Sequence, residues 1–208
     1  MPDQPDLQII SGRLERGEID SAQFLDQLMR FVSSRIGCAR AGLRLLIDGS
    51  AGPTMRCAVM YDATLDRMIS AADITHPAHG PYVEQLLRDG NITATRAPGD
   101  PLGGNADAGS LGAYMKEAGV SALMDMAFSV NGVLFGAFSC EQVDETPIDW
   151  TQRQLQTLRK ISARASLTLM HVLSMSLDTT PGALWETTNS PTRLSGLAPP
   201  QDRVDPDG

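Results

Sequence analysis

The feature that most constrains this chain is a hairpin between residues 121 and 141 whose turn is Asn131-Gly132. Asn-Gly between two β-rich runs favours a type I′ turn, because both central residues of that turn need a positive φ. A two-residue turn also fixes the register of the strands that it joins. The sequence therefore predicts these opposite pairs: Val130 with Val133, Phe128 with Phe135, Met126 with Ala137, and Met124 with Ser139.

The two faces of this hairpin differ in character. In the predicted register one face is bulky and apolar, whereas the other is smaller, mixed in polarity and holds the acid Asp125 near its middle. That second face carries Leu123, Asp125, Ala127 and Ser129 against Leu134, Gly136, Phe138 and Cys140. A sheet with one packed side and one roomier, partly polar side suggests a binding module. It gives no direct sign of catalysis.

Composition limits the classes of partner. The 208 residues carry a formal net charge of −8, which argues against nucleic acid because such binding depends on clustered Lys and Arg. No apolar run approaches the roughly 18 residues of a membrane span, and the acidic N-terminus lacks a secretion signal, so we expect a cytoplasmic protein. Cys38, Cys57 and Cys140 are an odd number without a Cys-x-x-Cys pair. They are expected to be small buried hydrophobic residues, with a redox-sensing thiol as the alternative.

The remaining elements follow from local signals. A short lead-in (1–18) precedes a helix that begins at a capping box of Asp20 and Gln23 and ends at Gly37. Strands are predicted at 43–47, 55–61, 67–71 and 92–95, and short helices at 81–89 and 110–118. The loop at 96–109 is either a lid or disordered. Thr151 and Gln154 form a second capping box at the start of a long final helix, and a Pro- and Gly-rich flexible tail is expected over 178–208.

The final helix carries two apolar stripes. The first, which includes Leu158, Ala165 and Leu169, suffices for packing on a sheet. The second includes Leu167 and Met170. It indicates either a homodimer seam or contact with the first helix.

The order of these elements and three of their motifs resemble a GAF domain of bacterial signalling proteins. The motifs are Gly119-Val-Ser-Ala-Leu-Met-Asp-Met-Ala-Phe128, Asn131-Gly-Val-Leu-Phe-Gly-Ala-Phe-Ser-Cys-Glu141 and Asp149-Trp-Thr-Gln-Arg-Gln-Leu155. The resemblance implies an α+β fold of the GAF (PAS/profilin-like) type over residues 19–177. In that fold an antiparallel sheet holds the terminal helices on one face, and short helices and a loop cover a pocket on the other.

The resemblance also implies a sensory domain that binds a small molecule without catalysis and signals through its terminal helices. We expect the ligand to lie between the sheet and residues 76–118. The predicted pocket residues are Tyr61, Asp73, Tyr82, Leu86, Asp125, Phe138 and Cys140. Tyr61 and Phe138 would supply apolar walls and Asp125 would fix the orientation of the ligand, although Asp125 could equally make a structural hydrogen bond to backbone.

No particular cofactor is implied. The absence of Cys between Cys57 and Cys140 argues against a thioether-linked bilin and against a methionine sulfoxide reductase, and no cyclic-nucleotide signature is recognisable. His76 and His79 could ligate haem but are typical of a surface turn.

Three alternatives follow for the function. The first is the sensor, which is a stand-alone protein, a regulator acting in trans, or a piece of a longer chain, because no output domain follows the final helix. The second is a degenerate GAF domain whose pocket is filled by side chains such as Met60, Met115 and Phe138 and which serves as an interaction or dimerisation module. A thiol enzyme acting through Cys140 comes third.

Overall fold

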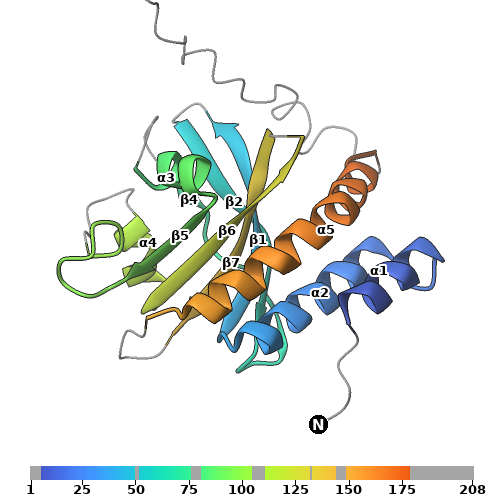
Figure 1. The fold of residues 1–208 in the computed structure, drawn as a ribbon, viewed down its shortest axis with the longest axis horizontal. Helices are drawn as coiled ribbons and strands as arrows, with labels where there is room; N and C mark the ends of the chain where they lie inside the picture. Colours follow the sequence, from blue (N-terminus) through green and yellow to red (C-terminus); the bar gives the residue numbers. More distant parts are fainter. Residues whose placement is uncertain are drawn as a thin grey trace, which may run out of the picture.

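The computed structural model describes residues 6–49, 52–75, 81–104, 111–131, 133–143 and 149–178. These residues form one antiparallel sheet and five helices (Figure 1). The helices are α1 (Leu7–Glu15), α2 (Ser21–Ile36), α3 (Pro81–Asp89), α4 (Leu111–Glu117) and α5 (Gln152–Asp178). The strands are β1 (Arg40–Gly49), β2 (Gly52–Asp62), β3 (Arg67–Ile69), β4 (Ile74–Thr75), β5 (Asn91–Thr95), β6 (Ala122–Val130) and β7 (Val133–Gln142).

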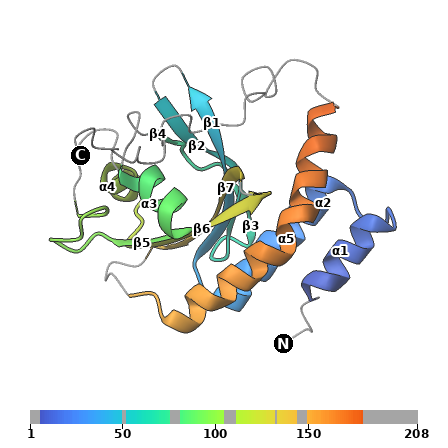
Figure 2. The ribbon, with the colours of Figure 1, turned by 45° about the horizontal axis from the view of Figure 1, so that its top comes forward.

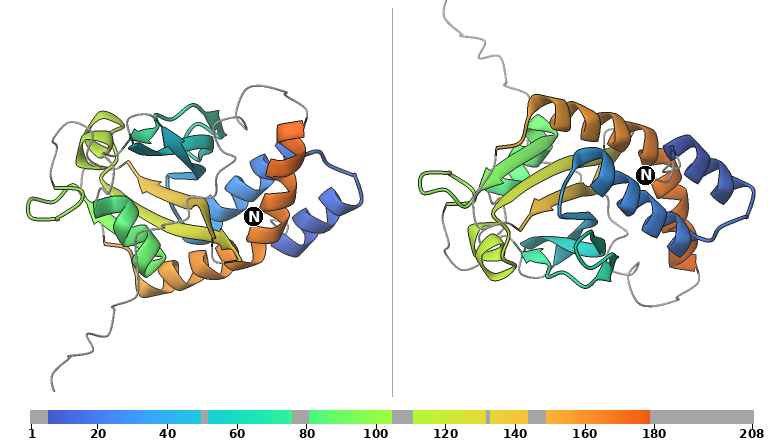
Figure 3. Two further views of the ribbon diagram at one scale, coloured as in Figure 1. Left: turned by 90° about the horizontal axis from the view of Figure 1, so that it is seen from above. Right: turned by 90° about the horizontal axis from the view of Figure 1, so that it is seen from below.

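The strand order is β3-β2-β1-β7-β6-β5, and β4 pairs with β2 beside β3. Figures 2 and 3 show α1, α2 and α5 on one face of this sheet and α3 and α4 on the other. Each face has its own apolar core. We call them the helix-side core, under α1, α2 and α5, and the α3-side core, under α3 and α4. The predicted α+β fold is therefore confirmed.

Both capping boxes form as expected. The backbone N–H of Gln23 donates to Asp20 Oδ1 at 2.8 Å, and the Asp20 N–H donates back to Gln23 Oε1 at 3.0 Å. At the start of α5, the N–H of Thr151 donates to Gln154 Oε1 at 2.9 Å. Gln154 also donates to the carbonyl of Ile36 at 2.9 Å, so the capping residue of α5 anchors the end of α2. These contacts fix where the two long helices begin.

The lead-in contains a helix that the sequence analysis did not expect. In α1, Leu7 and Ile10 lie three residues apart, so one helical face presents both, and both are buried in the helix-side core. The helix packs chiefly on α2 and α5. Tertiary packing of this short apolar face explains a helix too short to be stable in isolation.

The hairpin register differs from the prediction by one residue. Val130 pairs with Val133 as expected, but a bulge follows, after which Phe128 pairs with Gly136, Met126 with Phe138, and Asp125 with Ser139. Phe135 is the extra residue. Because side chains alternate across a strand, a slip of one residue moves β7 side chains to the opposite face. The predicted pairing beyond the first pair is therefore wrong.

A second bulge divides β2. The sequence predicted that Met55, Cys57, Val59 and Tyr61 share one face. In the structure the β1–β2 register shifts between Leu43 and Arg44. As a result Met55 lies in the α3-side core, whereas Tyr61 lies in the helix-side core.

Some expectations fall outside the described residues: His76 and His79, part of the 96–109 loop, Gly132 of the turn, and the segment after residue 178. Asn131 is described, and its φ of 52° is that expected of a type I′ turn. Among the helices of the described residues, none has the length and apolar character needed to cross a bilayer.

Candidate ligand-binding site

A charged pair lies inside the molecule on the α3-side face of the sheet. Arg44 comes from the middle of β1 and Glu141 from the end of β7, and both side chains are fully buried, with an Arg44 Nη2 to Glu141 Oε1 distance of 3.2 Å. The hydroxyl of Tyr114, on α4, accepts from Arg44 Nη2 and donates to Glu141 Oε1, both at 2.5 Å. The guanidinium also lies over the Tyr114 ring, 4.7 Å from its centre. These three residues tie α4 to the sheet.

A second polar group lies beside the first. Tyr82, on α3, donates its hydroxyl hydrogen to the carboxylate of Asp125 in β6. Ser139 lies directly opposite Asp125 on β7. All three residues are buried. The α3-side core is thus interrupted by a polar cluster, which we define as Arg44, Tyr82, Tyr114, Asp125, Ser139 and Glu141.

The electrostatics of the cluster follow from burial. Burial raises the pKa of Asp125 to about 6, even though the neighbouring Ser139 hydroxyl, the hydrogen bond from Tyr82 and the charge of Arg44 act to lower it. For Arg44, burial disfavours the charged form, but Tyr114, Glu141 and Asp125 outweigh it and raise the pKa above its ordinary value. Burial likewise raises the pKa of Tyr82 and Tyr114, so both remain neutral donors.

Several atoms of the cluster are left unpaired. Within the described residues, Arg44 Nε and Glu141 Oε2 have no hydrogen-bond partner, although Arg40 Nη1 lies 3.9 Å from Glu141 Oε2. The Ser139 hydroxyl is close enough to lower the pKa of Asp125, yet neither it nor Asp125 Oδ1 makes a well-formed hydrogen bond in this part of the chain. Buried polar atoms are normally paired, so this part of the cluster has donors and acceptors that the described residues leave unused.

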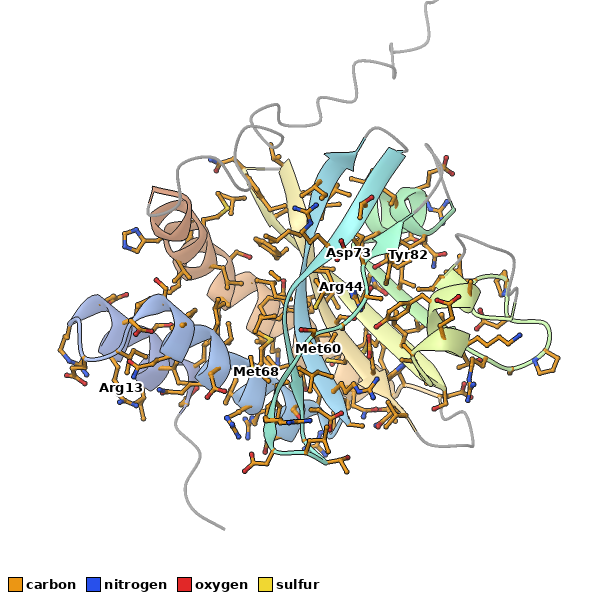
Figure 4. All side chains as sticks on the ribbon, turned by 180° about the vertical axis from the view of Figure 1, so that it is seen from behind. Arg13, Arg44, Met60, Met68, Asp73 and Tyr82 are labelled. Carbon is orange, nitrogen blue, oxygen red and sulfur yellow. The ribbon has the colours of Figure 1, made fainter. Side chains whose placement is uncertain are left out.

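Three of the predicted pocket residues lie together. Tyr82 and Leu86 of α3 are buried in the α3-side core, and Asp125 faces them from the sheet. Figure 4 shows Arg44 and Tyr82 near one another, with Asp73 beside them on the segment between β3 and β4. Asp73 is exposed, and its Oδ1 accepts the N–H of Cys57 at 2.9 Å. Asp73 therefore lies at the margin of the cluster.

The other three predicted pocket residues lie on the wrong face. Tyr61, Phe138 and Cys140 belong to the helix-side core. The two bulges are the cause, since each reverses the face of the residues that follow it. Phe138, for example, meets the Phe128 ring edge-on at 6.4 Å, under α2 and α5, instead of lining a pocket.

Sequence reasoning missed several members of the polar cluster. It took Asp125 and Tyr82 as site residues but not Arg44, Tyr114 or Ser139. One signal was available: Arg44 interrupts the apolar run Leu43-Arg-Leu-Leu-Ile47, and a charge inside a buried strand requires a partner. No group of three or more His, Cys, Asp or Glu side chains suited to a metal ion occurs within the described ranges.

The chain is a small α+β domain. One antiparallel sheet carries helices on both faces, and a polar cluster lies under the two short helices. A family model, described as GAF domain, matches residues 20–169, and the chain is a member of the GAF domain family. Domains of this family are generally sensory or binding modules, not enzymes. A comparison with curated proteins finds no match.

Solved structures agree with the fold. The blue-light absorbing form of the Thermosynechococcus elongatus PixJ GAF domain is 14% identical, with 76% of this chain and 91% of that chain covered and a TM-score of 0.53. The phycoerythrobilin-bound GAF domain of a cyanobacterial phytochrome is 13% identical, with coverage of 82% and 95% and a TM-score of 0.58. The bacteriophytochrome RpBphP3 of R. palustris is 13% identical, with coverage of 83% and 38% and a TM-score of 0.55. At these identities the likeness establishes the fold alone.

Proposed function

We propose that this chain is a cytoplasmic sensory domain that binds a small polar molecule at the polar cluster between the sheet and α3 and α4. The observation that carries this proposal is the convergence of buried atoms on Arg44, Asp125 and Glu141 that find no partner among the described residues. A purely structural cluster would be expected to satisfy its own hydrogen bonds, because each unpaired buried atom costs about 1–3 kcal/mol. A bound molecule would supply the missing partners. The phycoerythrobilin-bound GAF domain of similar fold lends general support.

The unpaired donor and acceptor atoms of the cluster define the chemistry of the ligand. Arg44 Nε offers a hydrogen-bond donor, whereas Asp125 Oδ1 and Glu141 Oε2 offer acceptors. We therefore expect a compact molecule with at least two N–H or O–H groups and one acceptor, such as a cyclic amide or an amino compound. A bare anion fits poorly, since two carboxylates face one guanidinium.

The fold offers a short route from this site to the terminal helices. Asp125 lies in β6, and two residues further along the carbonyl of Ala127 accepts a hydrogen bond at 2.8 Å from Ser162 of α5. A ligand that changes the position of β6 would alter the surface on which α5 packs. Signalling further requires that the ligand bind two arrangements of α5 with different affinity.

The experiment is a ligand search on matched variants. Protein purified under native conditions is analysed by native mass spectrometry, and its melting temperature is measured against a panel of small polar metabolites. We expect a compound that raises the melting temperature of the wild type and fails to do so for Glu141→Gln. Glu117→Gln, at an exposed position of α4, is the matched control and should respond like the wild type. Empty spectra together with no shift across the panel would contradict the proposal.

The second candidate function is that of an interaction module which dimerises through α5. It is favoured by Leu167, whose side chain is 74% exposed on that helix. A large apolar side chain at such a position on the second stripe fits a helical seam. This role is compatible with ligand binding, since the two sites lie on opposite faces of the sheet.

A further inference from the structure

A groove lies where α1, α2 and α5 meet, on the face of the sheet away from the polar cluster. It has a volume of about 240 Å³ and is lined by Asp6, Leu7, Phe31, Arg35, Thr157, Lys160, Ile161 and Arg164. Leu7, Phe31 and Ile161 are buried and give the groove an apolar floor. Arg35, Lys160 and Arg164 are exposed and lie around its opening. Figure 2 shows the three helices side by side.

Within the described residues the cations of this groove have no ionic partners. By contrast, Arg13 of α1 lies 3.7 Å from Glu18, and Arg30 of α2 lies 2.9 Å from Asp26. Among the described residues neither Lys160 nor Arg164 forms an ion pair, and Arg35 contacts the Phe31 ring at 5.9 Å instead. Asp6 is the single acid among the described lining residues, so these residues carry a net positive charge in a protein of net charge −8.

The groove also joins an added element to the domain. The family model begins at residue 20, whereas α1 covers Leu7–Glu15, so one wall of the groove lies outside the matched region. Leu7 of α1 and Ile161 of α5 both contribute to the floor. A molecule held there would contact both helices and stabilise the docking of α1.

From this arrangement we propose that the groove binds a small organic anion that has a short apolar tail, and that binding holds α1 against α5. The cations recognise the acid group and the floor takes the tail. The volume is below the roughly 300–1,000 Å³ of pockets for drug-sized ligands, so a tail of few carbons fits. This site stands apart from the one proposed for sensing, and neither depends on the other.

The test uses hexanoate as the probe, with hexanol and acetate as matched compounds. The backbone amide resonances of the whole chain are followed by NMR during each titration. We expect hexanoate to cause saturable shifts at residues of α1 and α5, because it alone carries both the charge and the tail. Hexanol lacks the charge and acetate lacks the tail, so both should bind more weakly. Added salt should weaken hexanoate binding through screening.

Variants then separate a specific site from general surface charge. Lys160→Gln combined with Arg164→Gln should weaken hexanoate binding at least about tenfold, which corresponds to about 1.4 kcal/mol. Arg159→Gln changes an exposed cation of the same helix that does not line the groove. The affinity of this variant for hexanoate should match that of the wild type. The proposal is overturned if hexanoate gives no saturable shift at α1 and α5, if hexanol binds as tightly, or if Arg159→Gln weakens binding as much as the double variant.

Discussion

The hydroxyl of Tyr82 donates to the carboxylate of Asp125 and thereby joins α3 to the middle of β6. Tyr82 is 1% exposed and Asp125 is completely buried, so this contact lies wholly inside the protein. The neighbouring bridge from Arg44 through Tyr114 to Glu141 joins α4 to the same face. Both short helices are therefore held above the sheet by polar contacts as well as by apolar packing. Any change of charge in the cluster should alter the packing of α3 and α4 on the sheet.

The first prediction concerns the dependence of stability on pH. The pKa of Asp125 in the folded protein is about 6, above the value of about 3.9 in an unfolded chain. Between these values the folded state retains a proton that the unfolded state has lost. The contribution of Asp125 to stability is therefore greatest below about pH 4 and is lost as the pH rises through about 6.

Asp125→Asn removes this titration while keeping a carbonyl acceptor for Tyr82. The quantity to follow is the difference between the two free energies of unfolding, wild type minus variant. We expect this difference to fall by at most about 3 kcal/mol as the pH rises from about 4 to about 7. Urea unfolding at a series of pH values measures this difference. The exposed Asp149→Asn is the control for the loss of a carboxylate at the surface. A flat curve for Asp125→Asn would show that the Asp125 carboxyl titrates as it does in the unfolded chain.

The second prediction concerns the buried pair of Arg44 and Glu141. Arg44→Met alone leaves Glu141 as a buried charge without its counter-ion, and we expect a loss of about 3–5 kcal/mol in the free energy of unfolding. Replacing both residues by Met removes the two charges together, so the double variant should be more stable than the sum of the single effects. Denaturant unfolding of all four proteins gives the coupling energy. Additive losses would mean that the pair is not coupled.

The third prediction concerns the close approach of β7 to β1. A Cβ atom built on Gly136 would lie 2.0 Å from the carbonyl oxygen of Arg44, so the two strands would have to separate. We expect Gly136→Ala to destabilise the protein by about 3 kcal/mol or more. The control is Gly12→Ala in α1, where the added Cβ meets only the end of the flexible Arg16 side chain and helix propensity improves. Equal melting temperatures for the two variants would argue against the tight contact.

Local signals in the sequence were enough to place most elements. A capping residue bonds to backbone three positions away, so Asp20 and Thr151 identify helix starts without any knowledge of the rest of the fold. The face assignments failed where the cause was not local. Phe135 is the extra residue of the hairpin bulge, and Gly136 after it lies against Arg44, some 90 residues earlier in the chain. The alternation of side chains along β7 does not predict that contact.

The polar cluster illustrates the same limit. Its members at positions 44, 114 and 141 are brought together only by the sheet order and by the docking of α4. From the sequence, Asp125 could be singled out because it stands alone in an apolar strand. Its partners Tyr82 and Ser139 lie on other elements. Arg44 carried the same signal as Asp125 and could have been recognised by the same argument.

The last prediction concerns the exposed stripe of α5. Leu167 is 74% exposed and makes little contribution to the core, so Leu167→Asp should change the free energy of unfolding of a monomer by no more than about 0.5 kcal/mol. If α5 forms a homodimer seam, as we propose, the same substitution buries a charge at the interface and should convert the dimer to a monomer. Sedimentation velocity over a range of protein concentrations measures this. Leu87→Asp, at a 41% exposed position on α3, is the matched control and should leave the dimer intact. A wild type that stays monomeric throughout, or a Leu167→Asp variant that still dimerises, would rule out this seam.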